Sequence, residues 1–119
     1  MNREEIIKTT GKKGEEIAVD YLLRNSYKIL SRNFHSKYGE IDVIAEKNDT
    51  IYFFEVKTRR PSSFTQPEES ITRSKISRII KTAQIFVSRT PQTRTKSWRI
   101  TLIGIVLDRN FTITLTEIL

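Results

Sequence analysis

Three side chains of types that support metal-dependent chemistry lie in two neighbouring apolar runs. Asp42 interrupts the run Gly39–Ala45, and Glu55 and Lys57 interrupt the run Phe53–Thr58. One or two carboxylates, with waters and phosphate oxygens, are the usual ligands of Mg²⁺ in proteins. A metal ion activates water and polarises a phosphate, and a nearby ammonium stabilises the charge that develops on it. The spacing therefore indicates a site for cutting phosphodiester bonds.

Both runs have the composition of β-strands. Residues 40–46 and 50–58 are rich in β-branched and aromatic side chains, which favour strands. The tetrapeptide Lys47–Thr50 between them contains Asn48 and Asp49, which are typical turn residues. The sequence therefore predicts a β-hairpin in which the two ends of this tetrapeptide pair with each other.

The register of this hairpin places charged side chains together. Asp42 falls opposite Glu55, and Glu40 falls opposite Lys57. Because side chains alternate between the two faces of a strand, these four residues are expected to share one face. The other face would carry Ile41, Val43, Phe54 and Val56.

The opposed carboxylates of Asp42 and Glu55 need an explanation. Two like charges directly across a hairpin repel each other, so the pair is unfavourable in a purely structural sheet. A bound cation removes that repulsion. The alternative is a solvated strand face of mixed charge in which Lys57 neutralises Glu40. Of the two, the metal site is the favoured interpretation.

Several motifs follow one another along the chain. They are Gly14-Glu15-x-x-Ala18 followed by Leu22, Tyr27-x-Ile29-Leu30-x-Arg32-Asn33, Gly39-Glu40-Ile41-Asp42, Phe54-Glu55-Val56-Lys57-Thr58-Arg59, Pro67-x-Glu69, Lys75 and Ala83. By these motifs the sequence resembles the PD-(D/E)xK nuclease superfamily, which includes restriction endonucleases and Holliday-junction resolvases. It resembles more closely the YraN-like family of small bacterial endonuclease-like proteins.

The resemblance implies a restriction-endonuclease-like fold and a metal-dependent nuclease. It implies that Asp42 and Glu55 are ligands of Mg²⁺ or Mn²⁺ and that Lys57 is the catalytic lysine. Glu15 would match a helix glutamate that joins the metal site in resolvase-like members. The alternative for Glu15 is an ordinary first-turn glutamate favoured by the helix dipole. Glu40 would assist, either beside the metal or by pairing with Lys57.

Two segments depart from the family pattern. Where relatives carry an acidic residue in a strand near the C-terminus, this chain has Trp98-Arg99-Ile100-Thr101. Where relatives carry glycine after the lysine, it has Arg60-Pro61-Ser62-Ser63-Phe64. Both departures concern the periphery that would bind substrate rather than the predicted carboxylates and lysine.

Composition indicates a small basic domain. The chain of 119 residues is long enough for one domain with a single core. The 21 Lys and Arg residues outnumber the 14 Asp and Glu residues and give a net charge of +7. This charge fits nucleic acid as the partner; the alternatives are a lipid surface, or a basic protein with no such partner.

The absence of cysteine excludes disulfides and thiolate metal sites. With no apolar run of about 18 residues and no signal-peptide core after Met1, we expect a cytoplasmic protein without a membrane segment.

The rest of the chain predicts two helices and three more strands. A helix over residues 3–25 contains Gly11 and Gly14, which either weaken its middle or mark the start of its packed part. A second helix is expected from the capping box Thr65-Gln66-Pro67-Glu68 to about Ser88. The strands are expected at residues 27–35, 98–107 and 111–119. The order α-β-β-β-α-β-β favours an α/β fold with a central mixed five-stranded sheet flanked by helices.

Two basic segments are candidates for binding nucleic acid. Arg59 and Arg60 begin a basic loop after the hairpin, and guanidinium groups match phosphate oxygens. The second helix is basic beside its apolar stripe, so it would contact a DNA backbone, although a solvated helix face is the alternative. Its basic residues are Arg73, Lys75, Arg78, Lys81 and Arg89.

Two single residues are interpreted as non-catalytic. His35 is the only histidine, and no pattern places it near the acids, so we interpret it as a surface or DNA-proximal residue. Trp98 opens a predicted strand, where an aromatic side chain more often packs than stacks on a base.

These features predict a metal-dependent endonuclease acting on DNA in repair or recombination. No motif reads base sequence, so structure-directed or non-specific hydrolysis is expected. If junctions are the substrate, two sites are needed, and hence a homodimer. The alternative is a non-catalytic nucleic-acid-binding module that retains the nuclease fold. A third class, an interaction protein without a nucleic-acid role, would show no salt-dependent DNA binding.

Overall fold

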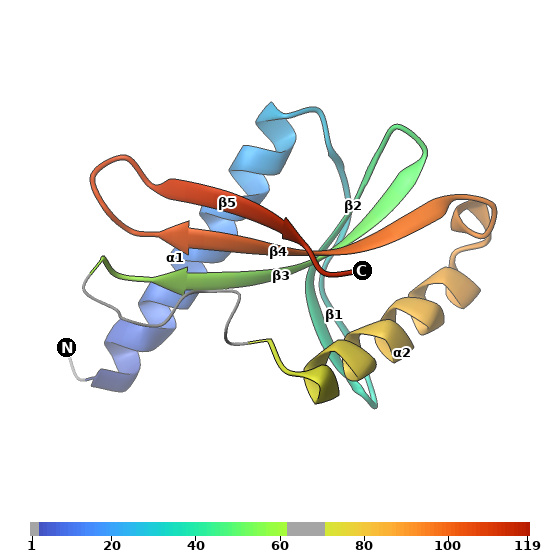
Figure 1. The fold of residues 1–119 in the computed structure, drawn as a ribbon, viewed down its shortest axis with the longest axis horizontal. Helices are drawn as coiled ribbons and strands as arrows, with labels where there is room; N and C mark the ends of the chain where they lie inside the picture. Colours follow the sequence, from blue (N-terminus) through green and yellow to red (C-terminus); the bar gives the residue numbers. More distant parts are fainter. Residues whose placement is uncertain (1–2, 62–70) are drawn as a thin grey trace.

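The computed structural model describes residues 3–61 and 71–119, with side chains of the first helix described from residue 12 onward. In these residues the order of elements is α-β-β-β-α-β-β, as predicted (Figure 1). The elements are α1 (Arg3–Arg24), β1 (Lys28–Ser36), β2 (Gly39–Lys47), β3 (Thr50–Arg59), α2 (Arg73–Arg89), the short 3-10 turn η2 (Pro91–Thr93), β4 (Ser97–Val106) and β5 (Thr112–Glu117).

The five strands form one mixed sheet in chain order, β1-β2-β3-β4-β5. All neighbours are antiparallel except β3 and β4, which run parallel. A parallel pair cannot be joined by a tight turn, and α2 lies in the connection between these two strands. The prediction of a mixed five-stranded sheet flanked by helices is therefore confirmed.

The two helices pack on opposite faces of the sheet (Figure 1). On the α2 face, helix residues Ile79, Ala83 and Phe86 pack with Ile41, Ile44, Ile51, Phe53 and Ile100. On the α1 face, helix residues Ala18 and Leu22 pack with Val43, Ala45, Phe54, Ile103 and Ile105. Trp98 meets Phe53 edge-on at 5.7 Å between ring centroids, which confirms its packing role.

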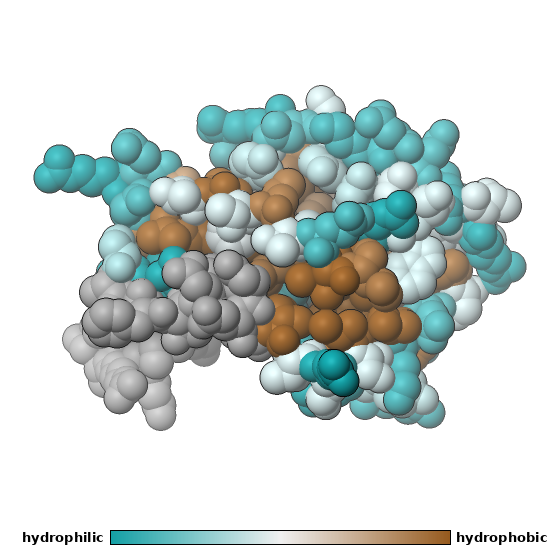
Figure 2. All heavy atoms as spheres, viewed as in Figure 1, coloured by the Kyte–Doolittle hydropathy of each residue, from teal (hydrophilic) through white to brown (hydrophobic). Residues whose placement is uncertain are grey.

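Figure 2 shows hydrophilic side chains around most of the rim in this view and apolar ones gathered between α2 and the end of β5. Ile118, which follows β5, packs against the α2-side core there. Neither of the two helices in the described ranges has the length and apolar character needed to span a bilayer.

The β2–β3 turn has the predicted form. Asn48 and Asp49 adopt positive φ angles of 51° and 59°, the conformation of a two-residue type I′ turn. Asn and Asp tolerate this left-handed region better than most residues. Lys47 pairs with Thr50 as predicted, and the pairing continues to Val43 opposite Phe54.

Helix α2 begins later than predicted. The capping box Thr65–Glu68 and the motif Pro67-x-Glu69 lie outside the described residues, but Ile71 and Thr72 are non-helical and the helix starts at Arg73. Thr72 is the N-cap, because its hydroxyl accepts a hydrogen bond of 3.1 Å from the backbone N–H of Lys75. A threonine suits an N-cap at either position, so the sequence alone did not distinguish Thr72 from Thr65.

Helix α1 runs through both glycines, and Gly14 is the first buried residue among its described side chains, so it marks the start of the packed part. Gly14 lies directly against Thr58 of β3. A Cβ atom on Gly14 would lie 1.9 Å from the Thr58 hydroxyl oxygen, well inside contact distance. Glycine thus lets α1 lie directly on the end of β3, which brings the next residue, Glu15, toward the predicted site.

The β1–β2 hairpin bends onto α2, which corrects one predicted face. Ile41 packs on the α2 face, whereas Val43 packs on the α1 face, so the side-chain alternation breaks between them. Asn33 lies opposite this break and has a positive φ of 52°. Beyond it Phe34 packs edge-on against Phe86 of α2. The break therefore turns the hairpin tip toward α2 and leaves Asp42 at the bend.

Candidate functional site

A cavity of about 290 Å³ opens between the β1–β2 hairpin, β3 and α2. The described residues that line it are Tyr38, Gly39, Glu40, Asp42, Glu55, Lys75, Arg78 and Ile79. The cavity thus brings together three of the predicted acids and two of the predicted basic residues.

Asp42 is partly buried and fixed by the backbone of the neighbouring strand. Its Oδ2 accepts a hydrogen bond of 2.7 Å from the backbone N–H of Val56, just beyond the last β2–β3 pair. Burial, followed by the negative charge of Glu55, raises the pKa of Asp42 from 3.8 to about 7, although the Val56 hydrogen bond opposes this. The site therefore favours a proton or another cation on this carboxylate.

Glu55 is buried, at 8% exposure, and lies between two ammonium groups. Its Oε1 is 2.5 Å from Lys75 Nζ and 3.8 Å from Lys57 Nζ. Burial and the charge of Lys75 lower the pKa of Lys57. Burial also opposes the charge of Lys75, but the hydrogen bond and the charge of Glu55 outweigh it and raise the pKa of Lys75. Lys75 is therefore the direct counter-ion of Glu55, and Lys57 is the more easily deprotonated lysine.

Sequence reasoning did not place Lys75 inside the site. It was predicted to contact phosphate from the outer side of the second helix. In the structure Lys75 precedes Ile79 by four residues and Ala83 by eight, so it extends the buried stripe of α2 by one more turn. That spacing was the signal available in the sequence.

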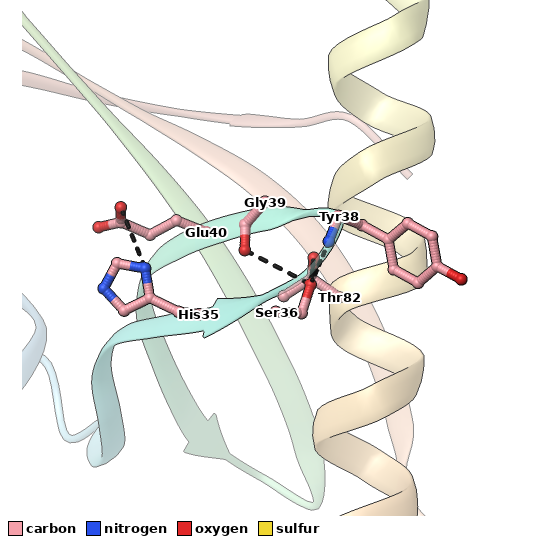
Figure 3. Close-up of polar contacts among 6 residues, drawn as sticks. All are labelled: His35, Ser36, Tyr38, Gly39, Glu40 and Thr82. Carbon is pink, nitrogen blue, oxygen red and sulfur yellow. Dashed lines mark hydrogen bonds and ion pairs between the residues drawn. The ribbon is translucent and has the colours of Figure 1, made fainter.

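Glu40 has a different partner from the predicted one. Its Oε2 lies 3.6 Å from Nδ1 of His35, its neighbour across the β1–β2 ladder (Figure 3). The β2–β3 pairing stops at Val43, so Glu40 is not held opposite Lys57, contrary to the prediction. His35 is exposed as predicted, and its contact with Glu40 is one that no sequence pattern indicated.

Glu15 does not line the cavity, but charged residues of the cavity act on it. Burial, followed by the negative charge of Glu40, raises the pKa of Glu15, and Arg32 partly offsets this. Arg32 itself forms an ion pair of 2.7 Å with Glu16, which ties β1 to α1. Among the described side chains, those of residues 12–61 and 71–119, no three acidic or histidine residues lie together as one set of metal ligands.

Two carboxylates are nevertheless a suitable donor set for Mg²⁺ or Mn²⁺. Asp42 and Glu55 line one open cavity and raise the energy of each other's charge. Mg²⁺ is commonly held by one or two carboxylates, with waters and phosphate oxygens completing the shell. Such an ion would compete with the Lys75 ammonium for Glu55.

The remaining basic residues divide into two groups. Arg78 lines the cavity, and Lys81 lies one turn further along α2 with its Nζ 5.2 Å from the centroid of the Tyr38 ring. Arg59 and Arg60 lie at the end of β3 and are not among the described residues that line the cavity. Of these four basic residues, the two on α2 therefore lie at or beside the cavity wall.

The sequence is similar to proteins from several bacteria. Residues 14–105 match the uncharacterised protein family UPF0102. The chain is 49% identical over 92 residues to a UPF0102 protein of Syntrophomonas wolfei, covering 77% of this chain and 76% of that one. It is 45% identical over 101 residues to a UPF0102 protein of Persephonella marina, covering 85% and 86%. A UPF0102 protein of Dictyoglomus thermophilum is 39% identical over 110 residues, covering 92% and 89%.

The matched segment begins at Gly14, the contact of α1 with β3, and ends within β4. It therefore includes the whole cavity wall that the structure describes and the strands that carry Asp42, Glu55 and Lys57. The chain belongs to the UPF0102 family, as its resemblance to the YraN-like proteins predicted.

Proposed function

We propose that this protein is a metal-dependent endonuclease acting on DNA, with a restriction-endonuclease-like fold of the PD-(D/E)xK superfamily. The observation that carries the proposal is the carboxylate pair of Asp42 and Glu55 in one open cavity, with Lys57 Nζ 3.8 Å from Glu55. The order of the elements and the position of these residues on β2 and β3 support the superfamily placement.

A purely structural role explains the Asp42 carboxylate poorly. Its hydrogen bond to the Val56 N–H needs only an acceptor, which an asparagine oxygen would supply without a charge. The carboxylate instead adds negative charge beside Glu55 and has its pKa raised to about 7. An ionisable group in a cleft whose pKa is strongly shifted by burial and by a neighbouring charge is a candidate for a functional role. Binding a divalent cation would relieve the repulsion between Asp42 and Glu55.

Each residue has a role that follows from its position. Asp42 and Glu55 would hold the ion, which when bound supplies an activated water and a polarised phosphate. Lys57, already beside Glu55, would donate hydrogen bonds to the phosphate oxygen that gains charge. Glu40 and Glu15 would assist by adding negative charge around the site, since both act on the pKa of Asp42.

The basic side chains indicate how DNA would approach. Arg78 and Lys81 on α2 continue from the cavity wall and would contact phosphates upstream or downstream of the cut, with Arg59 and Arg60 contributing from the end of β3. The sequence contains no motif that reads bases, so recognition would depend on DNA structure or be non-specific. Junction cleavage would require a homodimer.

A second candidate function is a non-catalytic nucleic-acid-binding module. The observation that favours it is the direct contact of Lys75 with Glu55, because this ammonium already neutralises one of the two carboxylates. In that case the basic side of α2 would bind DNA and the cavity would take no metal. Metal-dependent cleavage separates the two functions.

A cleavage panel tests the proposal. Wild type, Asp42→Ala/Lys57→Ala and Asp20→Asn would be incubated with duplex, single-stranded, flap and four-way-junction DNA in Mg²⁺, Mn²⁺ or EDTA. Asp20 is an exposed acid of α1 paired with Arg24, so its variant is a matched control for loss of a carboxylate. The proposal predicts cutting by wild type and Asp20→Asn that EDTA and the double variant abolish. Binding without cutting in every protein would support the binding module.

A further inference from the structure

Tyr38 is an exposed aromatic residue on the wall of the candidate cavity. It occupies the turn between β1 and β2, lines the cavity with Asp42 and Glu55, and remains 37% exposed. Figure 3 shows its ring projecting from the turn over α2, away from Glu40 and His35. The proposed cleavage chemistry assigns this ring no role.

The turn that carries Tyr38 is fastened to α2 by a chain of hydrogen bonds. The Thr82 hydroxyl donates to the Arg78 carbonyl oxygen at 2.9 Å and lies 2.7 Å from the Ser36 hydroxyl (Figure 3). The Ser36 oxygen accepts from the backbone N–H of Tyr38 at 3.0 Å. Gly39 supports the same turn with a φ of 155°, which side-chain-bearing residues rarely adopt. The backbone under the Tyr38 ring is thus held in place before any ligand binds.

Two ammonium groups lie over the ring. Lys37 Nζ and Lys81 Nζ each lie 5.2 Å from the centroid of the Tyr38 ring. They come from different elements, the hairpin turn and α2. An exposed aromatic ring accompanied by two ammonium groups suits a ligand that combines a π-face with negative charge, which a nucleotide does.

A basic ridge joins this ring to the carboxylates. Lys75 contacts Glu55, Arg78 lines the cavity, and Lys81 contacts Tyr38. These residues are three apart on α2 and span about 9 Å of helix, the rise of two or three nucleotides of a DNA strand. A strand whose phosphates followed the ridge would have a base at Tyr38 when one of its phosphates reached the cavity.

We infer that Tyr38 stacks on an unpaired base and that the substrate is DNA with a single-stranded segment at the site. This inference rests on the proposed function and specifies its substrate class. In intact duplex the faces of the bases are covered by their neighbours, so a lone protein ring gains stacking only from a single strand, a flap, an end or a branch point. The ridge holds the backbone, and the ring selects the unpaired form.

The test compares binding of a labelled single strand and a blunt duplex of the same length by fluorescence anisotropy in EDTA. Tyr38→Ala is expected to weaken single-strand binding by about 5- to 100-fold, the range for loss of one stacked base. Duplex binding should change by no more than about twofold. Tyr38→Phe keeps the ring and should bind both ligands as wild type does, within about twofold.

Salt dependence distinguishes stacking from charge. Tyr38→Ala should leave the slope of log affinity against log salt unchanged, because no phosphate contact is lost. Lys81→Gln is the matched control from the same contact, and it should weaken both ligands and reduce the slope by about one. Equal weakening of single strand and duplex by Tyr38→Ala, or no weakening of either, would overturn the inference.

Photo-crosslinking of wild type covers the case in which Tyr38→Ala fails to fold. A single strand carrying 5-iododeoxyuridine should crosslink to the peptide that contains Tyr38, and crosslinks confined to other peptides would overturn the inference. Neither readout requires cleavage. If DNA binding depends on Tyr38 but no metal-dependent cutting is seen, the proposed nuclease activity alone is refuted. If Tyr38→Ala changes neither cutting nor binding, the stacking role alone is refuted.

Discussion

Lys75 in α2 and Glu55 in β3 form a direct ion pair, with 2.5 Å between Nζ and Oε1. The ammonium lies at the carboxylate that is also proposed to hold a metal ion. One negative charge of the Asp42–Glu55 pair is therefore already neutralised, and the other is not. In this arrangement a divalent cation and Lys75 compete for the same oxygen, and the released ammonium would be available for a substrate phosphate.

Replacing Lys75 tests this competition. Lys75→Met should destabilise the metal-free protein by about 1–3 kcal/mol, because Glu55 loses its nearest counter-charge while Lys75 is only partly buried. Mg²⁺ should then raise the melting temperature of Lys75→Met more than that of wild type, since no ammonium opposes it. Thermal unfolding in EDTA and in Mg²⁺ measures both effects.

Lys81→Met is the control for Lys75→Met, because it removes a lysine of the same helix that contacts the Tyr38 ring and not Glu55. Its Mg²⁺-induced rise in melting temperature should match that of wild type. A Mg²⁺-induced rise in melting temperature that is no larger in Lys75→Met than in wild type would argue against competition at Glu55.

The raised pKa of Asp42 predicts a specific pH dependence of stability. Between about pH 4 and 7 the folded protein keeps a proton that the unfolded chain has released, so the free energy of unfolding falls as pH rises through this window. Three pKa units correspond to about 4 kcal/mol, and partial exposure reduces this to roughly 2–4 kcal/mol. Asp42→Asn, which retains an acceptor for the Val56 N–H, should remove this loss.

Urea unfolding in EDTA at about pH 4.5, near the lower end of this window, and at about pH 8, just above its upper end, measures the effect. Asp42→Asn should gain stability relative to wild type at the higher pH and little at the lower one. Asp20→Asn, which removes an exposed carboxylate, should show no such difference. A gap between Asp42→Asn and wild type that stays constant with pH would contradict the shifted pKa.

Gly14 predicts an unusual response to alanine. In an exposed helix, glycine to alanine is favourable by about 1 kcal/mol. Here the new Cβ would meet the Thr58 hydroxyl at 1.9 Å, so Gly14→Ala should destabilise the protein by about 1–3 kcal/mol instead. Thr58→Ala removes the nearest atoms and should reduce that cost. A double-mutant cycle measured by chemical unfolding gives the coupling, and independent, additive effects would rule out the close contact.

The hairpin was predictable because its determinants are local. Asn48 and Asp49 define a two-residue turn, and that turn alone fixes the register as far as Val43. The break at Asp42 was not predictable, because it depends on contacts between residues far apart in sequence, such as Ser36 with Thr82 and Phe34 with Phe86. The strand pattern therefore gave the wrong face for Ile41.

The candidate site likewise combines features set by local sequence with features set by long-range contacts. Asp42, Glu55 and Lys57 were identified from their spacing in two adjacent strands, where side-chain direction follows from the sequence period. The partners of these residues come from elsewhere, Lys75 from α2 and His35 from β1, and required the tertiary fold. The start of α2 was misplaced because the sequence offers the same capping side chain at Thr65, outside the described residues, and at Thr72, which caps the helix.

Thr82 offers a test of the hairpin anchor. Thr82→Val keeps the shape of a fully buried side chain but removes the hydroxyl that joins Ser36 to α2. We expect a loss of about 1–3 kcal/mol in unfolding free energy, because Ser36 is left without this partner in a partly buried position. Ser36→Ala should cost less in the Thr82→Val background than in wild type, because the contact between the two hydroxyls is already lost there. Chemical unfolding of the four proteins gives the coupling, and additive effects of the two substitutions would mean that the two hydroxyls are not coupled.

The cleavage rate of a flap or four-way-junction DNA as a function of Mg²⁺ concentration tests the central claim most directly. The predicted result is a rate for wild type that saturates with Mg²⁺ and is about 100- to 1000-fold lower in both Asp42→Asn and Lys57→Met, with DNA binding retained. A rate that the two variants share with wild type, or no Mg²⁺-dependent cutting by any folded protein in the set, would contradict the assignment of Asp42, Glu55 and Lys57 as a catalytic site.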